Sequence, residues 1–178
     1  IMVAMPIWYV IGVMITFAPE IGQKLGLAAA PKASRAILFY YLGLTLGDLT
    51  SGFLSQRFGN RKKVIAVFMV ITTVLGIAYF LAGGRSLGTF YGICGVLGWS
   101  SGYWAVFLTT AAEQFGTNIR ATVAVTAPNF VRGLMVPITL AFKGLAPQFG
   151  TLPVAAGLGV LVVVLAFLAL TQLEETYG

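Results

Sequence analysis

The sequence predicts an all-α integral membrane protein, and three observations carry that prediction. Hydrophobic residues make up 58% of the 178 residues, only 9% are charged, and the mean hydropathy is +0.93. A soluble domain carries roughly 25% charged residues, so a water-soluble enzyme is close to excluded. The apolar residues also form consecutive stretches of about 20, the length that a membrane-crossing helix needs. Because backbone polar groups in lipid must be satisfied internally, stretches of this length are expected to be helices.

Six such stretches follow one another along the chain. The first, Ile1–Pro19, falls just short of a full span and has no basic flank, so we interpret it as a span without its first turns and not as a signal peptide. The other five, two of which hold a single charge, are Ala36–Gln56 (with Asp48), Val64–Gly83, Leu87–Ala112, Ala121–Phe142 (with Arg132) and Thr151–Leu173. Residues 1–178 are therefore expected to form one six-helix transmembrane domain, cut from a longer protein.

Six spans place both chain ends on the same side of the membrane. That side receives the loops 57–63 and 113–120, and the opposite side receives 20–35, 84–86 and 143–150. Each side holds five Lys and Arg residues, so the positive-inside rule is tied by count. The dense basic cluster at 57–63 favours the first side as cytoplasmic.

A weak internal repeat divides the chain into two units of three spans, residues 1–83 and 84–178. In each unit a glutamate ends the first span, an Arg-Ala pair begins the second, and one charge lies within the second span. The matching positions are Glu20 with Glu113, Arg35 with Arg120, and Asp48 with Arg132. Since three is odd, the two units would have inverted topologies, an arrangement that is common in transporters.

The composition argues against catalysis and against nucleic-acid binding. Histidine is absent, which removes His-based acid–base chemistry and His-containing metal motifs, and the single cysteine, Cys94, forms no internal disulfide. We therefore expect no catalytic residues, no metal site and no cofactor. The net charge of +6 does not indicate nucleic acid, because the basic residues separate long apolar runs and form no solvated basic face.

Three loop sequences resemble signatures of the major facilitator superfamily of transporters. Gly-Phe-Leu-Ser-Gln-Arg-Phe-Gly-Asn-Arg-Lys-Lys at 52–63 resembles the family's Gly-x-Leu-Ala-Asp-Arg-x-Gly-Arg-Arg/Lys loop, with Gln56 in place of Asp. Glu-Gln-Phe-Gly-Thr-Asn-Ile-Arg-Ala at 113–121 resembles its Glu-x-Phe-Pro-x-x-x-Arg-Ala turn, with Gly116 in place of Pro. Leu-Glu-Glu-Thr-Tyr-Gly at 173–178 resembles its closing Pro-Glu-Thr-x-Gly, with Glu174 in place of Pro.

The resemblance covers the whole chain and implies a fold and a function. The chain would be helices seven to twelve of a twelve-helix secondary transporter, and its partner would be the missing amino-terminal half. A small solute would cross the lipid bilayer by alternating access, with loops 57–63 and 113–120 on the cytoplasmic side of the plasma (inner) membrane. On that side the family implies a gating charge network, and the residues at its motif positions are Gly52, Arg57, Gly59, Arg61, Glu113 and Arg120. The alternative is that these charges are solvated and only set topology.

Six residues within the expected spans are candidates for contact with a solute or a coupling ion: Trp8, Tyr41, Asp48, Trp104, Asn129 and Arg132. A charge near the bilayer centre costs at least about 2.5–3.5 kcal/mol, so Asp48 and Arg132 need a partner or water. Helical spacing places Asp48 on a polar stripe with Tyr41, Thr45, Gly52 and Ser55, which indicates either a proton carrier or a structural seam.

Arg132 has three interpretations. It would bind an anionic substrate, form an ion pair with Asp48, or extend its side chain to the membrane surface. Pro128 and Pro137 interrupt the same stretch and predict kinks. The alternative function is a self-contained six-helix channel or a structural membrane subunit, which would need no second half.

Overall fold

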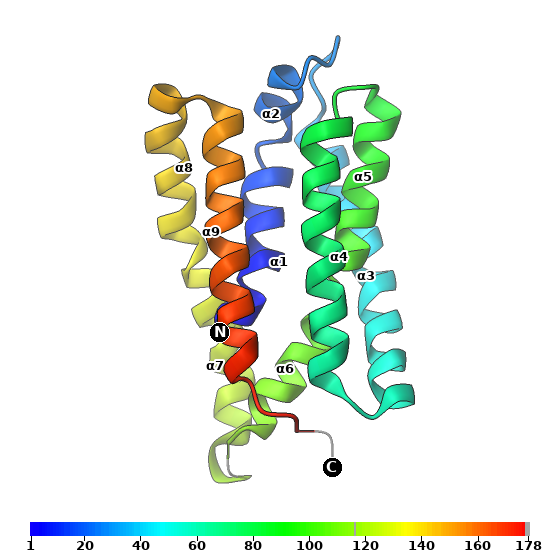
Figure 1. Ribbon diagram of the computed structural model, residues 1–178, viewed down its shortest axis with the longest axis vertical. Helices are drawn as coiled ribbons and strands as arrows, with labels where there is room; N and C mark the ends of the chain where they lie inside the picture. Colours follow the sequence, from blue (N-terminus) through cyan, green and yellow to red (C-terminus); the bar gives the residue numbers. More distant parts are fainter. Residues whose placement is uncertain (116, 177–178) are drawn as a thin grey trace.

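The computed structural model describes residues 1–115 and 117–176, and the regular elements in this part of the chain are all helices. They run back and forth between the two ends of an elongated bundle (Figure 1). Among the described residues, the helices long and apolar enough to cross a membrane are α3 (Ala33–Phe58), α4 (Arg61–Ala82), α9 (Thr151–Gln172) and the consecutive pair α7 (Thr117–Gly133) and α8 (Met135–Phe149). The predicted all-α class with apolar, membrane-length helices is thereby confirmed at the level of four spans.

The first expected span is a bent segment and not one straight helix. Its parts are η1 (Met2–Ala4), α1 (Met5–Tyr9), the π-helical turn η2 (Val10–Ile15) and α2 (Ala18–Lys24). The direction changes by 69° between η2 and α2, and the two together count as a fifth span if taken as one. Pro19 has no N–H to donate to the carbonyl of Ile15, four residues earlier, where η2 ends. The helix therefore breaks before Pro19 and continues beyond it to Lys24.

The fourth expected span, Leu87–Ala112, is also interrupted, which corrects the sequence-based prediction of one continuous helix. The chain forms α5 (Leu87–Ser100) and α6 (Trp104–Glu113), and neither is long enough to cross a membrane alone. At the break, Gly102 lies directly on the backbone of α3, where a Cβ would overlap Gly47 and Asp48. The close approach fixes the position of the break.

The fifth expected span shows how proline position decides where a helix ends. Pro128 lies inside α7 without interrupting it, whereas α7 ends at Gly133 and α8 begins at Met135. Pro137 lies four residues after Gly133 and cannot donate to its carbonyl, so the interruption falls there. The helix is therefore interrupted near Pro137 and not at Pro128, and α7 and α8 together still form one apolar span.

Helices α3 and α5 pack backbone against backbone. A Cβ on Gly43 would overlap the carbonyl of Gly95, and one on Gly98 would overlap the carbonyl of Tyr40. Small residues permit this approach and are the usual means of helix association in lipid. The glycines at these positions are therefore packing residues, although Gly92 on the same helix faces open space.

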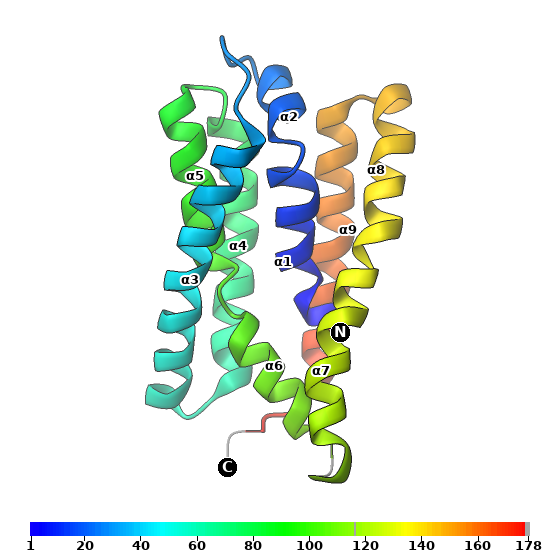
Figure 2. The ribbon, with the colours of Figure 1, turned by 180° about the vertical axis from the view of Figure 1, so that it is seen from behind.

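Buried tyrosines from three other parts of the chain support the irregular first segment. The hydroxyl of Tyr40 donates to the carbonyl of Ile7 at 3.2 Å, and that of Tyr79 donates to Met14 at 2.8 Å. Tyr103 donates to Val3 at 3.1 Å. Departures from the regular α-helix leave carbonyls without their usual partner, and buried polar groups need one. The first segment consequently lies in the middle of the bundle, between the α3–α5 side and the α8–α9 side (Figure 2).

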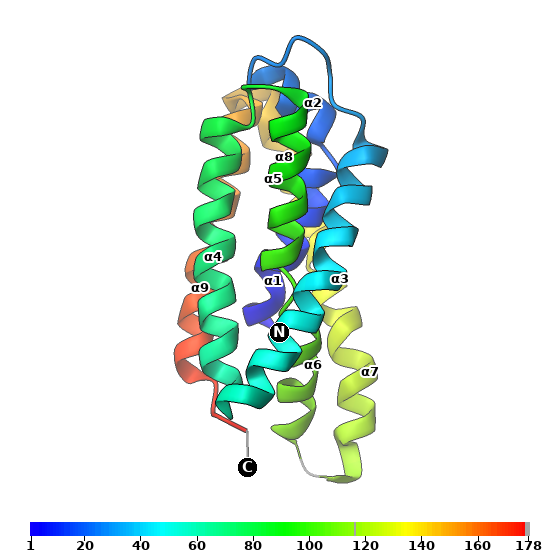
Figure 3. The same cartoon turned by 90° about the vertical axis from the view of Figure 1, so that its right-hand side faces the viewer.

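The loops lie at the two ends of the bundle, as expected when successive helices run in opposite directions. The α3–α4 turn, the end of α6 and residues 173–176 share one end, and α2 and the α8–α9 turn share the other (Figure 1). Figure 3 shows α4 and α9 on one flank of the bundle, and α3 and α7 on the other. Gly116 and residues 177–178, which belong to two of the three signature sequences, lie outside the described residues.

Candidate functional site

Four of the six predicted site residues lie in one cluster, each on a different helix. The guanidinium carbon of Arg132 (α7) lies 5.2 Å from the centroid of the Trp8 ring (α1). The rings of Trp8 and Trp104, the first residue of α6, meet edge to face with centroids 5.6 Å apart. Asp48 (α3) reaches the backbone next to Trp104, where its Oδ1 accepts a hydrogen bond from the N–H of Ala105 at 3.2 Å. The cluster thus joins helices from both expected repeat units.

Asp48 acts as the cap of α6. The first N–H groups of a helix have no partner within it, and Tyr103, which precedes α6, supplies no side-chain cap. The carboxylate of Asp48 provides one from a different helix, where its negative charge also matches the positive end of the helix dipole. This bond is what the structural-seam interpretation predicted, and the proton-carrier role stays a prediction.

Asp48 and Arg132 form no ion pair in the described part of the chain. The carboxylate of Asp48 is bonded to α6, and the guanidinium of Arg132 lies over Trp8. Arg132 is exposed and lies on α7 against Trp8 of α1. Figure 2 shows α1, α3, α6 and α7 together on one side of the bundle. Of the interpretations weighed for Arg132, the internal pair is the one that this geometry does not support.

The other two candidates, Tyr41 and Asn129, lie outside the cluster's contacts. Tyr41 is exposed, and its ring meets only the edge of Tyr40. Asn129 is exposed and donates to the carbonyl of Val125 on its own helix at 3.2 Å. The predicted polar stripe is split between two sides of α3, because the buried face consists of Ala36, Tyr40, Gly43, Gly47, Ser51 and Ser55. Tyr41 and Thr45 face outward.

A second cluster of charged residues lies at the end of the bundle where α4 begins. Arg61, the first residue of α4, forms an ion pair with Glu113, the last residue of α6, and both side chains are mostly buried. Glu175 accepts hydrogen bonds from the backbone N–H of Arg61 at 3.1 Å and of Lys62 at 3.0 Å. Asn60 accepts from Lys63 at 2.8 Å, so three successive N–H groups of α4 are capped. We call Arg61, Glu113 and Glu175 the charge cluster.

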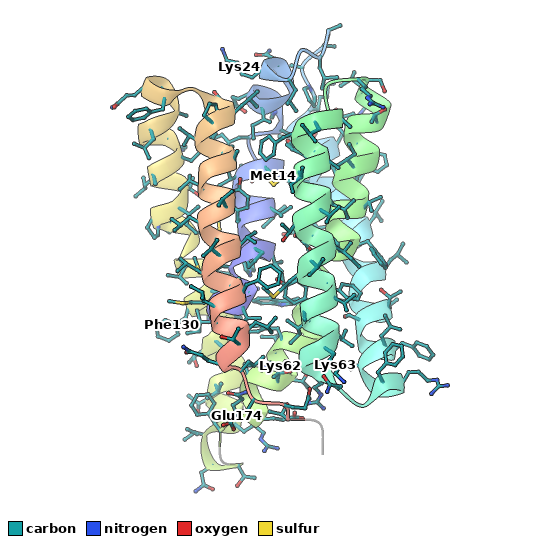
Figure 4. All side chains as sticks on the ribbon, viewed as in Figure 1. Met14, Lys24, Lys62, Lys63, Phe130 and Glu174 are labelled. Carbon is teal, nitrogen blue, oxygen red and sulfur yellow. The ribbon has the colours of Figure 1, made fainter. Side chains whose placement is uncertain are left out.

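The last turn of α9 and the tail after it have further bonds to the same end of the molecule. Lys62 Nζ donates to the carbonyl of Thr171 at 3.3 Å, and Gln114 Nε2 donates to the carbonyl of Glu174 at 3.1 Å. Figure 4 shows Lys62, Lys63 and Glu174 at this end and Lys24 at the other. These bonds hold α4, α6 and α9 together at one end of the bundle.

The charge cluster differs in membership from the predicted network. Arg57 and Arg120 are exposed and form no ion pair within the described residues. Gly59 ends α3 with φ of +57°, a left-handed conformation that glycine adopts without strain, and this turn sets the start of α4. Gly52 has open space where a side chain would be. Glu175 lies within the closing motif at 173–178, but the sequence did not predict it as a member of the charge network.

An apolar cleft of about 320 Å³ lies between α1, α4 and α9. Its lining includes Tyr9, Met14, Gly76, Phe80 and Gly159, and Met14 is seen between α4 and α9 in Figure 4. The cleft holds no charged side chain. Its lining therefore offers no charged group to a polar solute. A hollow of about 450 Å³ between α2, α8 and α9 does carry charges, on Glu20, Lys24 and Lys143, but it lies at one end of the bundle (Figure 1). We take the Arg132 cluster as the candidate site because four predicted residues lie in it.

No protein-family model matches the chain. No curated protein matches it, and no solved structure does. Among the described residues, no group of histidine, cysteine, aspartate and glutamate side chains could hold a metal ion. The function is therefore inferred from the three signature-like loops, from the charge cluster, and from the group of Trp8, Asp48, Trp104 and Arg132.

Proposed function

We propose that the chain is the carboxy-terminal half of a secondary active transporter of the major facilitator type. One observation carries the proposal. The three signature-like loops are far apart in the sequence, yet residues from all three meet in the charge cluster: Arg61 from 52–63, Glu113 from 113–121 and Glu175 from 173–178. Alternating helices already bring these three segments to one end of the bundle, and the support for the proposal is that residues at the motif positions are the ones that bond there.

The transport mechanism would be alternating access with six spans in two inverted triplets, residues 1–83 and 84–178. The two halves of the whole transporter rock about a site near the membrane midplane. The charge cluster holds α4, α6 and the tail together in one access state, and its end of the bundle faces the cytoplasm of the plasma (inner) membrane. The solute contacts the side formed by α3, α1, α6 and α7, and the proton is a candidate coupling ion through Asp48.

The exposed side chains support the presence of a second half. Helix α3 presents several large apolar side chains outward: Leu38, Leu42, Leu46, Leu49 and Phe53. Helix α7 buries only Ala127 and Val131, although it also carries exposed threonine, asparagine and arginine side chains. Lipid would cover the leucines but not the polar residues of α7, whereas a second half with a water-filled cavity would suit both.

Reconstitution into vesicles tests the proposal. We expect this chain alone to conduct no ions and take up no solute, and co-reconstitution with the amino-terminal half to give saturable uptake. In the two-half protein, Glu113→Gln should alter uptake while Arg120→Gln, which removes an exposed charge without an ion pair, should not. Steady conductance through the chain alone would instead establish the channel alternative.

A further inference from the structure

We propose that Arg132, Trp8 and Trp104 form a binding site for an organic anion. An oxyanion group of the ligand pairs with the guanidinium of Arg132, and its apolar body lies against the two indole rings. The inference rests on the proposed function, for which it names the substrate class.

The charge of Arg132 has no ion-pair counterpart among the residues that the structure describes. The sequence holds five acidic residues. Glu20 lies on α2 at one end of the bundle, whereas Glu113, Glu174 and Glu175 lie at the other end (Figures 1 and 4). The fifth, Asp48, caps α6 and forms no ion pair with Arg132 in the described structure.

The depth of Arg132 makes this missing partner significant. Arg132 follows Arg120 by twelve positions of continuous helix, which is about 18 Å at 1.5 Å per residue. The helices α7 and α8 together have 33 residues, about 50 Å, which is more than a span about 30 Å thick, and α7 begins beyond the ends of α4 and α9 (Figure 1). Arg132 therefore lies less than about 18 Å inside the membrane, and within the apolar layer a cation needs a counter-charge or water. An anion that enters from the exposed side of α7 supplies this counter-charge.

Trp8 carries an indole nitrogen, Nε1, that is buried and has no hydrogen-bond partner among the described residues. An indole N–H only donates, so the group that satisfies it must be an acceptor. The exposed guanidinium of Arg132 is the group that a carboxylate or phosphate can contact directly, and an oxygen atom would reach the buried indole nitrogen of Trp8 only after a shift of the neighbouring side chains.

Aromatic rings next to Arg132 offer a surface for the apolar part of the ligand. The face of Trp8 lies under Arg132, Trp104 contacts the edge of Trp8, and Phe107 lies 5.5 Å from Trp104 between ring centroids. Such a surface binds flat apolar groups by stacking or edge contact. An inorganic anion would use only the guanidinium, whereas an aromatic carboxylate would also contact the half-buried rings of Trp8 and Trp104, behind which Phe107 is buried.

The test uses the chain's own fluorescence, because tryptophan occurs only at positions 8, 99 and 104. In a Trp99→Phe background in neutral detergent, emission comes only from the two tryptophans of the site. Iodide, an anionic quencher, should quench this emission at least about twofold less in Arg132→Gln, because the guanidinium concentrates anions near the rings. Acrylamide, a neutral quencher, should act equally on both. Arg120→Gln is the matched control and should leave iodide quenching unchanged.

Competition identifies the ligand class. Benzoate should reduce the quenching of tryptophan emission by iodide. Benzamide has the same shape but is neutral, and it should not reduce the quenching. Equal iodide quenching in wild type and Arg132→Gln, or equal protection by benzoate and benzamide, would overturn the site.

A lipid headgroup shares the oxyanion chemistry, so vesicles separate the two sources. Protection by phosphatidylglycerol vesicles but not by benzoate would assign the site to lipid and overturn a soluble substrate. Fluorescence reports binding without transport. Binding in a reconstituted protein that transports nothing would therefore count against the proposed function alone, and transport without binding would count against this site alone.

Discussion

The Oδ1 atom of Asp48 on α3 lies 3.2 Å from the backbone nitrogen of Ala105, the second residue of α6. One side chain thus joins a long helix to the start of a short one, next to the close contact between Gly47 and Gly102. The position of α6 depends on this bond, because α5 and α6 are not one continuous helix.

Changes at Asp48 should separate its capping role from a charge role. Asp48→Ala removes the cap and should lower the free energy of unfolding by about 0.5–2 kcal/mol. Asp48→Asn keeps an acceptor and should cost clearly less. Reaction of a thiol-specific dye with Cys94, which is fully buried, reports thermal unfolding of each variant. Equal losses for Asn and Ala would show that the cap is not the main role of Asp48.

A double-mutant cycle should show that Asp48 and Arg132 are not an ion pair. The effects of Asp48→Asn and Arg132→Gln on stability should add to within about 0.5 kcal/mol, since the side chains form no pair. The positive control is Arg61→Gln with Glu113→Gln, for which coupling is expected. Recovery of stability in the Asp48–Arg132 double variant would restore the ion-pair interpretation.

Two glycines of α5 offer a matched pair. Gly98→Ala should destabilise the protein by about 1–3 kcal/mol, because the new methyl group would overlap the carbonyl of Tyr40. Gly92→Ala on the same helix has open space and should be neutral or slightly stabilising. Thermal unfolding of the two variants decides, and equal melting temperatures would contradict the close packing of α3 and α5.

The charge cluster should control the conformational balance. Glu113→Gln should shift the balance between access states by about 1–3 kcal/mol without preventing membrane insertion. Exchanging the charges, with Arg61→Glu and Glu113→Arg together, should restore part of the shift. Cysteine cross-linking across the cytoplasmic mouth of the two-half transporter measures it. If neither single variant changes cross-linking, the pair has no gating role.

Topology is testable by labelling intact cells in a Cys94→Ala background. Phe58→Cys, next to the basic loop, should be protected from an impermeant thiol reagent, because the loops 57–63 and 113–120 are expected to be cytoplasmic. Ala30→Cys should react, since it is exposed in the loop at the other end. The reverse pattern would invert the assignment.

The helical class followed from the sequence because apolar stretch length decides it. The broken helices were harder to predict, since they depend on contacts between distant residues. A glycine at 102 breaks the helix only because Gly47 lies against it. The effect of Pro137 is the loss of a hydrogen bond to the carbonyl of Gly133, four positions earlier, where α7 ends.

Within the sites, composition found the unusual residues but not their partners. Trp8, Trp104 and Arg132 were selected because aromatic and charged residues are rare at such depth, and the fold brings them together. The polar stripe predicted from the sequence contains Tyr41, which the structure places on the exposed side of α3, whereas the neighbouring Tyr40 is the buried tyrosine. Glu175 was missed because its role lies in bonds to the backbone of α4, which no pattern in the sequence displays.

The short helix α6 is held at both ends, by Asp48 at its start and by the Arg61–Glu113 pair at its finish. Ten residues of helix measure about 15 Å, so a tilt of about 10° at one end moves the other by roughly 2–3 Å. That displacement is enough to break a hydrogen bond or an ion pair. Because α6 also packs against α3, α4 and α7, a change of charge at Asp48 would reach Glu113 through α6 only together with a shift of these neighbouring helices.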